Sequence, residues 1–195
     1  MIKPQNFYDS LNHNGVDFYT GVPDSLLKDI CSYISDNAPA EKHIISANEG
    51  GAIALAMGYY LASNKIPLVY MQNSGFGNTI NPLLSLADPK VYSIPMILLI
   101  GWRGEPGIKD EPQHVKQGEV SETLLKTLDI PYVVVSNETS DFNKVVSDAV
   151  SHAKVNNIPF AILIKKGTFE PYSLINKLKT NFDLNREEAI IKSTE

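Results

Sequence analysis

Ile44-Ile45-Ser46-Ala47-Asn48-Glu49-Gly50-Gly51-Ala52 joins an apolar strand to a glycine-rich helix, and this junction gives the strongest indication of the fold. The helix continues to Leu61 with almost no polar face, which is typical of a helix buried on every side. We expect a partner surface to cover it; a well-covered core helix is the alternative. Glu49 begins this helix, where burial raises the pKa of a carboxyl group and suits it to share a proton at neutral pH. Its alternative role is to complement the positive end of the helix dipole.

The rest of the chain alternates short β-rich runs with helical patterns, which predicts an α/β fold with a mostly parallel sheet. Most of the β-rich runs are continuously apolar, as in strands that helices cover on both faces. The clearest amphipathic helix follows a cap at Thr139-Ser140 and extends to Ala153. The six strands are expected at residues 17–20, 43–47, 68–72, 96–100, 132–135 and 160–164.

Composition excludes several classes of protein. The 195 residues are 43% hydrophobic and 20% charged, which is ordinary for a globular domain. The net charge of -5 argues against non-specific binding to nucleic acid or to an anionic membrane surface. The longest apolar run, around 95–100, is far shorter than the roughly 20 residues that span a bilayer. Cys31 is the only cysteine and forms no internal disulfide, so we expect a cytoplasmic location.

The character of the sequence changes after Gly167. Residues 168–195 are polar, contain two lysine-rich stretches and show weak periodicity. We therefore expect residues 1–167 to form one domain, and residues 168–195 to be a linker or tail toward a domain that this sequence lacks.

Unusual residues concentrate in the loops that follow the expected strands. In a parallel sheet these loops gather at one edge, where ligands bind. The loops at the opposite edge, such as Ser63-Asn64-Lys65, are plain connections. The sequence therefore predicts a binding site built from the loops at 21–25, 48–51, 73–81 and 101–114.

The glycine-rich loop at 73–81 is neither of the two common phosphate loops. Ile80 stands where the third glycine of a dinucleotide fingerprint would be, and no Gly-Lys-Ser/Thr triplet follows. Glycines that allow a flat ring to approach, with Asn73, Asn78 and Asn81 nearby, suit an uncharged heterocycle. A flexible strand-to-helix turn explains the same residues equally well.

Together these motifs resemble the pyrimidine-binding domain of thiamine-diphosphate-dependent decarboxylases, over residues 5–167. Within that family the pattern is nearest to phosphonopyruvate decarboxylases and next nearest to alpha subunits of sulfopyruvate decarboxylases. The motifs that carry the resemblance are Gly21-Val22-Pro23-Asp24, Ala47-Asn48-Glu49-Gly50-Gly51-Ala52, Gln72-Asn73-Ser74-Gly75-Phe76-Gly77-Asn78-Thr79-Ile80-Asn81-Pro82, and Gly101-Trp102-Arg103-Gly104 with Asp110-Glu111-Pro112-Gln113-His114.

The resemblance implies a thiamine-diphosphate-dependent carboxy-lyase that converts 3-phosphonopyruvate to phosphonoacetaldehyde and CO2, with sulfopyruvate as the alternative substrate. Glu49 would hydrogen-bond the aminopyrimidine ring of the cofactor and favour its imino tautomer. Asp24 and His114 would be the proton donor and its helper. The residues implied in cofactor binding are Glu49, Asn73, Ser74, Gly75, Phe76, Gly77 and Asn78.

Ser25 and Arg103 are candidate substrate-binding residues, because an arginine pairs well with a phosphonate or a carboxylate. Each of these residues also has a simpler interpretation. Asp24 is placed to cap the helix that follows it. His114 lies among acids in a loop, and Arg103 is placed to form a surface ion pair with one of them.

The family pattern is incomplete in one respect, since no Gly-Asp-Gly occurs in this sequence. The resemblance therefore implies that another domain or a second subunit binds Mg2+ and the diphosphate, and that the chain alone is inactive. No metal-ligand spacing occurs among the four histidines. We expect a homo-oligomer; the alternative from another class is a non-catalytic α/β module for oligomerisation or ligand binding.

Overall fold

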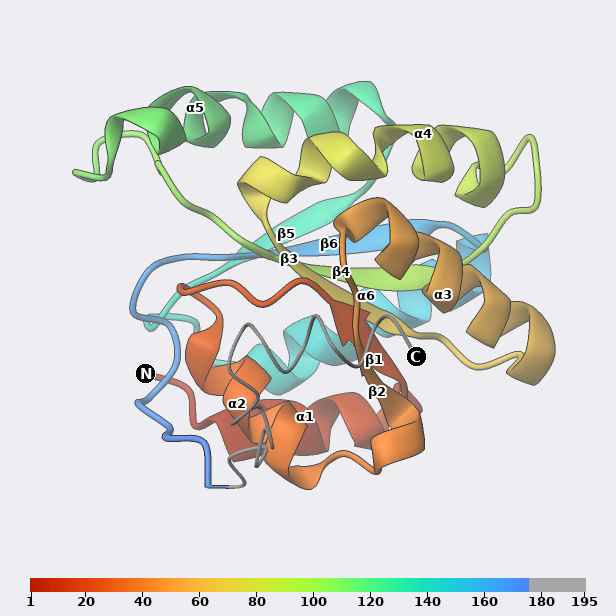
Figure 1. Cartoon of the computed structure of the whole chain (residues 1–195), viewed down its shortest axis with the longest axis horizontal. Coiled ribbons are helices and arrows are strands. Elements are labelled where there is room, and N and C mark those ends of the chain that lie inside the picture. Colours follow the sequence, from red (N-terminus) through yellow and green to blue (C-terminus); the bar gives the residue numbers. More distant parts are fainter. Residues whose placement is uncertain (176–195) are drawn as a thin grey trace, which may run out of the picture.

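Six parallel strands form one sheet, in the order β2-β1-β3-β4-β6-β5, in the computed structural model, which describes residues 1–175 (Figure 1). The parallel α/β fold expected from the sequence is therefore confirmed. The strands are β1 (Tyr19–Gly21), β2 (His43–Ile45), β3 (Leu68–Gln72), β4 (Met96–Gly101), β5 (Tyr132–Val135) and β6 (Pro159–Ile164).

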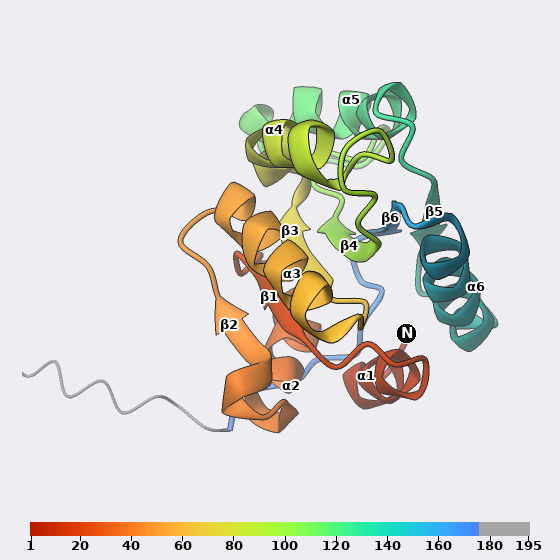
Figure 2. The same ribbon diagram turned by 90° about the vertical axis from the view of Figure 1, so that its right-hand side faces the viewer.

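Helices cover both faces of the sheet (Figures 1 and 2). One layer consists of α1 (Pro4–His13), α2 (Lys28–Asn37) and α6 (Phe142–Asn156). The other layer consists of α3 (Glu49–Ser63), α5 (Pro112–Thr127) and a helical segment between β3 and β4. That segment comprises η2 (Asn73–Thr79), α4 (Ile80–Pro82) and η3 (Leu83–Ala87), while the short turn η1 (Ala40–Lys42) precedes β2.

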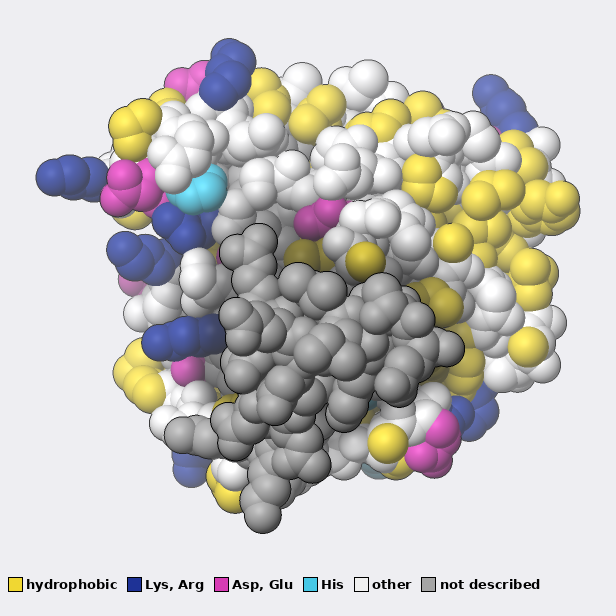
Figure 3. Space-filling model, in the orientation of Figure 1, with side chains coloured by type: hydrophobic (Ala, Val, Ile, Leu, Met, Phe, Trp, Pro, Cys, Tyr) yellow, Lys and Arg dark blue, Asp and Glu magenta, His cyan; other side chains and the backbone are white. Residues whose placement is uncertain are grey.

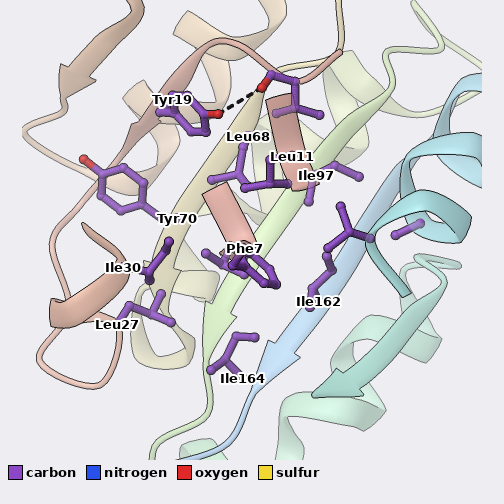
Figure 4. Packing of buried hydrophobic residues seen from close by; sticks show 14 of the residues in the cluster. Phe7, Leu11, Tyr19, Leu27, Ile30, Leu68, Tyr70, Ile97, Ile162 and Ile164 are labelled. Carbon is purple, nitrogen blue, oxygen red and sulfur yellow. Dashed lines mark hydrogen bonds between the residues drawn. The ribbon is translucent and has the colours of Figure 1, made fainter. Parts of the chain in front are cut away.

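Two apolar clusters, one on each face, hold the layers to the sheet. Alternate residues of a strand point to opposite faces. In β4, Ile97 and Leu99 enter the cluster under α1, α2 and α6, whereas Leu98 and Ile100 enter the cluster under α3. Figure 4 shows the first of these clusters around Phe7. Burial on both faces explains why the strands are continuous apolar runs in the sequence.

The strand ends differ slightly from the expected ranges. β3 and β5 begin and end as predicted, but β2 stops at Ile45 instead of Ala47. The reason is that β2 pairs only with β1, and β1 ends at Gly21. The cap of α6 is also one residue later than expected, because the Asp141 side chain accepts from Lys144 N.

Helix α3 is apolar on both its inner and its outer side. Ile53 and Met57 face the sheet and are buried. Leu55 and Leu61 lie on the outer side and are 38% and 63% exposed. Figure 3 shows hydrophobic side chains gathered on the side where Figure 1 places α3 and α4. Within the described residues, nothing covers this outer side.

The core continues a short way beyond Gly167. Phe169 is 5% exposed, forms a bridge with Ile2 and packs edge-on against Phe7. Tyr172 then crosses α2, where its hydroxyl donates to Asp36. The division at residue 167 stays a prediction, and most of the expected tail, 176–195, lies outside the described residues. Of the helices in residues 1–175, none combines the length and the apolarity that a bilayer crossing requires.

Candidate active site

Glu49 lies at the carboxyl edge of the sheet, as the first residue of α3. Asn48 caps the helix by accepting from Gly51 N at 2.8 Å, which fixes where Glu49 begins. The Glu49 side chain reaches the loop after β3, where its Oε2 accepts from Asn78 Nδ2 at 2.8 Å. A Cβ atom on Gly75 would overlap the Glu49 carboxylate, so the two loops meet only because residue 75 has no side chain. The structure thus brings Glu49, Gly75 and Asn78 together.

One residue anchors the loop after β3 to the core, whereas three others are exposed to solvent. Phe76 is 2% exposed and belongs to the apolar cluster under α3, so its side chain holds the loop to the core. Ser74, Gly77 and Asn78 are exposed. The loop therefore presents polar groups and glycine backbone at the edge of the sheet.

Asn73 is buried, and its side chain links two other elements. Its Nδ2 donates to the Arg103 carbonyl at 2.8 Å and to Ser121 Oγ at 3.0 Å, while its Oδ1 accepts from Arg103 N at 3.1 Å. Asn73 therefore fixes the backbone after β4 and binds it to α5. This arrangement makes Asn73 a support for the site rather than an exposed ligand group.

Arg103 forms a two-point ion pair with Asp110. Arg103 Nε donates to Asp110 Oδ2 at 2.8 Å, and Nη2 donates to Oδ1 at 2.6 Å. These bonds from the guanidinium hold the pKa of Asp110 well below its usual range, and the same pair raises the pKa of Arg103. The ion pair anticipated as the simpler interpretation of Arg103 is present. In addition, Arg103 Nη1 donates to Ser25 Oγ at 2.9 Å, which joins the loops after β4 and β1.

Asp24 is 5% exposed, and its carboxyl group is only partly satisfied. Oδ2 accepts from Leu27 N at 3.2 Å, so the capping interaction exists, whereas Oδ1 has no hydrogen-bond partner among the described residues. Gly101 makes room for this carboxyl group, because a Cβ there would overlap Oδ2. Burial raises the pKa of Asp24. A buried acid with an unpartnered oxygen binds a proton more readily than an exposed aspartic acid does.

His114 lies in the first turn of α5 and is half-buried. Its Nδ1 is buried and has no hydrogen-bond partner in the described part of the chain. The His114 carbonyl packs on Gly104, and Gly104 packs on Gly118, both too closely for a side chain. These contacts clamp α5 onto the loop that carries Arg103. Within residues 1–175, no hydrogen bond links His114 to Asp24.

A groove of about 330 Å³ opens beside the loop after β1. Asp24, Ser25 and Lys28 line it together with Ile45 and Tyr70. Ser25 is exposed, so its hydroxyl is accessible from solvent. At this end of the site lie one exposed hydroxyl, one buried acid and one exposed lysine.

These residues suit a flat, uncharged heterocycle better than a phosphate. Glu49 Oε1 accepts no hydrogen bond from the described residues, Asn78 offers its exposed side-chain amide, and the exposed Gly77 has no side chain to cover its backbone. Such a set can hydrogen-bond ring nitrogens while the ring lies on the backbone. In the same residues, no group of three or more His, Cys, Asp or Glu is arranged to hold a metal ion.

Sequence reasoning gave no role to Asp110, although it lies within a quoted motif. The available signal was an acid seven residues after Arg103 in a loop with three glycines. That spacing has no fixed meaning outside a regular element. The turns at Gly104 and Gly107, with φ of 68° and 84°, lie between Arg103 and Asp110, where the chain turns back and brings the carboxylate to the guanidinium.

Comparison with protein families and curated proteins adds independent information. The family described as "Thiamine pyrophosphate enzyme, N-terminal TPP binding domain" matches residues 5–125. A phosphonopyruvate decarboxylase of Streptomyces viridochromogenes is 31% identical over 167 residues. A sulfopyruvate decarboxylase subunit alpha of Methanococcus maripaludis is 38% identical over 166 residues.

The matches cover different shares of these relatives. The aligned region is 86% of this chain and 41% of the Streptomyces protein, so the chain spans about two fifths of that relative. It is 84% of this chain and 95% of the Methanococcus subunit. Among solved structures, benzoylformate decarboxylase from Polynucleobacter necessarius matches with a TM-score of 0.64 and 16% identity, over 92% of this chain and 34% of that one. That likeness concerns the fold alone.

Proposed function

Since this chain belongs to the family of thiamine pyrophosphate enzyme N-terminal TPP-binding domains, as its motifs predicted, we propose that it forms the pyrimidine-binding half of a decarboxylase for a small anionic 2-keto acid. The contact between Glu49, Gly75 and Asn78 carries this proposal. It places a carboxyl group at the edge where ligands of parallel sheets bind.

Thiamine diphosphate, when bound, supplies the electron sink for loss of CO2. Glu49 would offer Oε1 to a ring nitrogen of the aminopyrimidine as a hydrogen-bond partner. Asn78 keeps the Glu49 carboxylate in place through Oε2, so Oε1 has a fixed direction. Asn73 and Phe76 hold this loop to the rest of the domain, and Gly75 leaves room for the Glu49 carboxylate, while the exposed Ser74 and Gly77 would contact the cofactor.

The remaining site residues have proposed roles toward the substrate. Asp24 would hold a proton at its unpartnered oxygen and donate it to the carbon that has lost CO2, and His114 would assist from the first turn of α5. Ser25 lines the groove, where the acidic group of the keto acid would be bound, and Arg103 contributes there through its hydrogen bond to Ser25.

The first candidate substrate is 3-phosphonopyruvate, converted to phosphonoacetaldehyde and CO2. The second is sulfopyruvate, since relatives named for each of the two activities match this chain at similar identity. The two differ in the charge of the terminal group, which is why the groove beside Ser25 and Lys28 is the region that separates them. A comparison of kcat/KM for the two substrates decides between them.

We further propose that a diphosphate-binding domain or second subunit completes the site and holds Mg2+. The outer side of α3 carries exposed Leu55 and Leu61, which is consistent with a covered surface in a homo-oligomer. The chain alone is then inactive and binds thiamine diphosphate weakly. Micromolar affinity of the isolated chain by calorimetry would contradict this expectation.

The decisive test replaces Glu49 in the assembled decarboxylase. Glu49→Gln keeps the shape and removes the proton-holding carboxylate, so we expect kcat to fall by about 10²-fold or more. Glu119→Gln is the matched control, because Glu119 is an exposed acid on α5 that pairs only with Lys116 among the described residues. A non-catalytic ligand-binding module becomes the better description if Glu49→Gln and the control behave alike, or if neither keto acid is turned over.

A further inference from the structure

The Asp110 carboxylate occupies the ion-pairing side of Arg103 before any ligand arrives. Both Nε and Nη2 point to Asp110, and the pair is shielded, with side chains 22% and 14% exposed. Because the Asp110 carboxylate already compensates the positive charge of this guanidinium, Arg103 attracts a second anion only weakly. Arg103 is therefore poorly placed to be the direct receptor for an acidic group of the substrate.

The same pairing directs one remaining N–H of Arg103 at Ser25. The Nη1 to Oγ distance of 2.9 Å makes the Ser25 oxygen an acceptor. A serine hydroxyl has one proton to donate and two acceptor positions. Because Arg103 fills one acceptor position, the Ser25 proton is turned away from the guanidinium. Ser25 is exposed and lines the groove, so that proton is available to a ligand there.

Both members of the ion pair are held by backbone contacts. Asp110 Oδ2 accepts from Gly104 N at 2.9 Å, and Oδ1 accepts from Glu111 N at 2.8 Å. The backbone of Arg103 is fixed by the buried Asn73. A polar group held in this way keeps its direction without a ligand, which is the condition for a preorganised site.

We propose that Asp110 is a positioning residue: by pairing with Arg103 it aims Nη1 at Ser25 Oγ, and so makes the Ser25 hydroxyl a donor to an anionic oxygen of the bound keto acid. This inference rests on the proposed function. Asp110 acts through two other side chains and touches neither cofactor nor substrate. Ser25, not Arg103, makes the contact with the keto acid.

A double-mutant cycle in the assembled decarboxylase tests the proposal. Asp110→Asn, Ser25→Ala and the double variant are assayed with phosphonopyruvate and with sulfopyruvate. We expect Asp110→Asn to lower kcat/KM by about tenfold, the effect of one hydrogen bond, mainly through a higher KM. In the Ser25→Ala background the same substitution should change kcat/KM by less than about twofold, since its effect passes through Ser25. Asp148→Asn, which removes an exposed acid paired with Lys144, is the control and should leave both constants unchanged.

The outcomes separate this inference from the proposed function. If the Asp110 and Ser25 effects multiply, or if Asp110→Asn lowers kcat at constant KM as a loss of folded enzyme does, the positioning role is wrong. If Asp110→Asn unfolds the chain, Arg103→Lys replaces it in the cycle, because lysine lacks the fork that spans both partners. Full activity of Glu49→Gln would overturn the proposed function instead. Loss in Glu49→Gln with no effect of Asp110→Asn would overturn only the positioning role.

Discussion

A Cβ atom built on Gly75 would lie 2.8 Å from Glu49 Cγ and closer still to the carboxylate, so the loop after β3 and the first turn of α3 fit together only without that atom. The conformation of Gly75 does not require glycine, since its φ is not in the left-handed region. Space for the Glu49 side chain is therefore the reason for this glycine. A substitution at Gly75 can therefore test whether the position of the Glu49 carboxylate matters.

Gly75→Ala should displace the Glu49 carboxylate while leaving the fold nearly intact, because the atoms in the way belong to the end of a flexible side chain. A shift of about 1 Å in such a group costs about 10²-fold in rate, so we expect that loss in kcat of the assembled enzyme. Thermal unfolding should change little. Gly77→Ala is the matched comparison, since a Cβ there meets no atom within 4 Å, and its loss should be much smaller. Equal losses would show that the carboxylate position is unimportant.

Asp24→Asn should separate stability from activity. Burial raises the pKa of Asp24, so ionisation is disfavoured in the folded chain. The free-energy cost of ionising Asp24 in the folded chain is absent below about pH 3.9, the pKa in the unfolded chain. The cost grows as the pH rises above that value and through the higher pKa of the folded chain. We therefore expect Asp24→Asn to raise the unfolding temperature at pH 7, with a smaller gain near pH 4.

The same Asp24→Asn variant keeps an oxygen for the capping bond from Leu27 N but has no acidic proton to transfer. If Asp24 holds the reacting proton, kcat should fall by about 10²-fold in the more stable variant. Thermal melts from pH 4 to pH 8 and steady-state rates check the two parts separately. A stable variant with full activity would limit Asp24 to capping.

In contrast to Asp24→Asn, Asp110→Asn should lower the stability of the folded chain at neutral pH. The pKa of Asp110 is held low by the Arg103 guanidinium, so its stabilising effect is present above about pH 3.9, the unfolded value, and is lost as pH falls through the folded pKa. We expect the variant to be about 1 kcal/mol less stable at pH 7, since the pair is partly exposed. Urea titrations at pH 7 and pH 3 should show the difference shrinking in acid. Asp148→Asn, in an exposed pair with Lys144, should show only a few tenths of this effect.

Leu61→Lys should weaken self-association if the outer side of α3 is a homo-oligomer surface. Leu61 is 63% exposed, and a charge there opposes burial against a second copy. Val155 on α6 is 75% exposed, so Val155→Lys changes surface polarity to a similar degree on the other helical layer. Sedimentation velocity over a range of concentrations should show dissociation of the Leu61 variant only. A wild-type chain that sediments as a monomer at every concentration would rule out this surface for self-association.

The sequence predicted the regular parts of the fold well, and the reason is the apolar pattern. β3 and β5 were located to the residue because each is a largely apolar run that follows a proline and ends at or just before a polar residue. The end of β2 was misplaced because pairing with β1, not the side chains of Ser46 and Ala47, decides where β2 stops. Strand length at a sheet edge depends on the neighbouring strand, which local sequence does not contain.

The sequence by itself determined which loops form the site, because parallel strands place all their carboxyl ends at one edge and the unusual residues follow those ends. Only the tertiary structure decided the partners within the site: Asn78 for Glu49, and Asp110 with Ser25 for Arg103. Those pairings join residues 29, 7 and 78 positions apart through irregular loops. Regular elements repeat their geometry and can be inferred from spacing, whereas loop side chains take their partners from packing distances that no local pattern encodes.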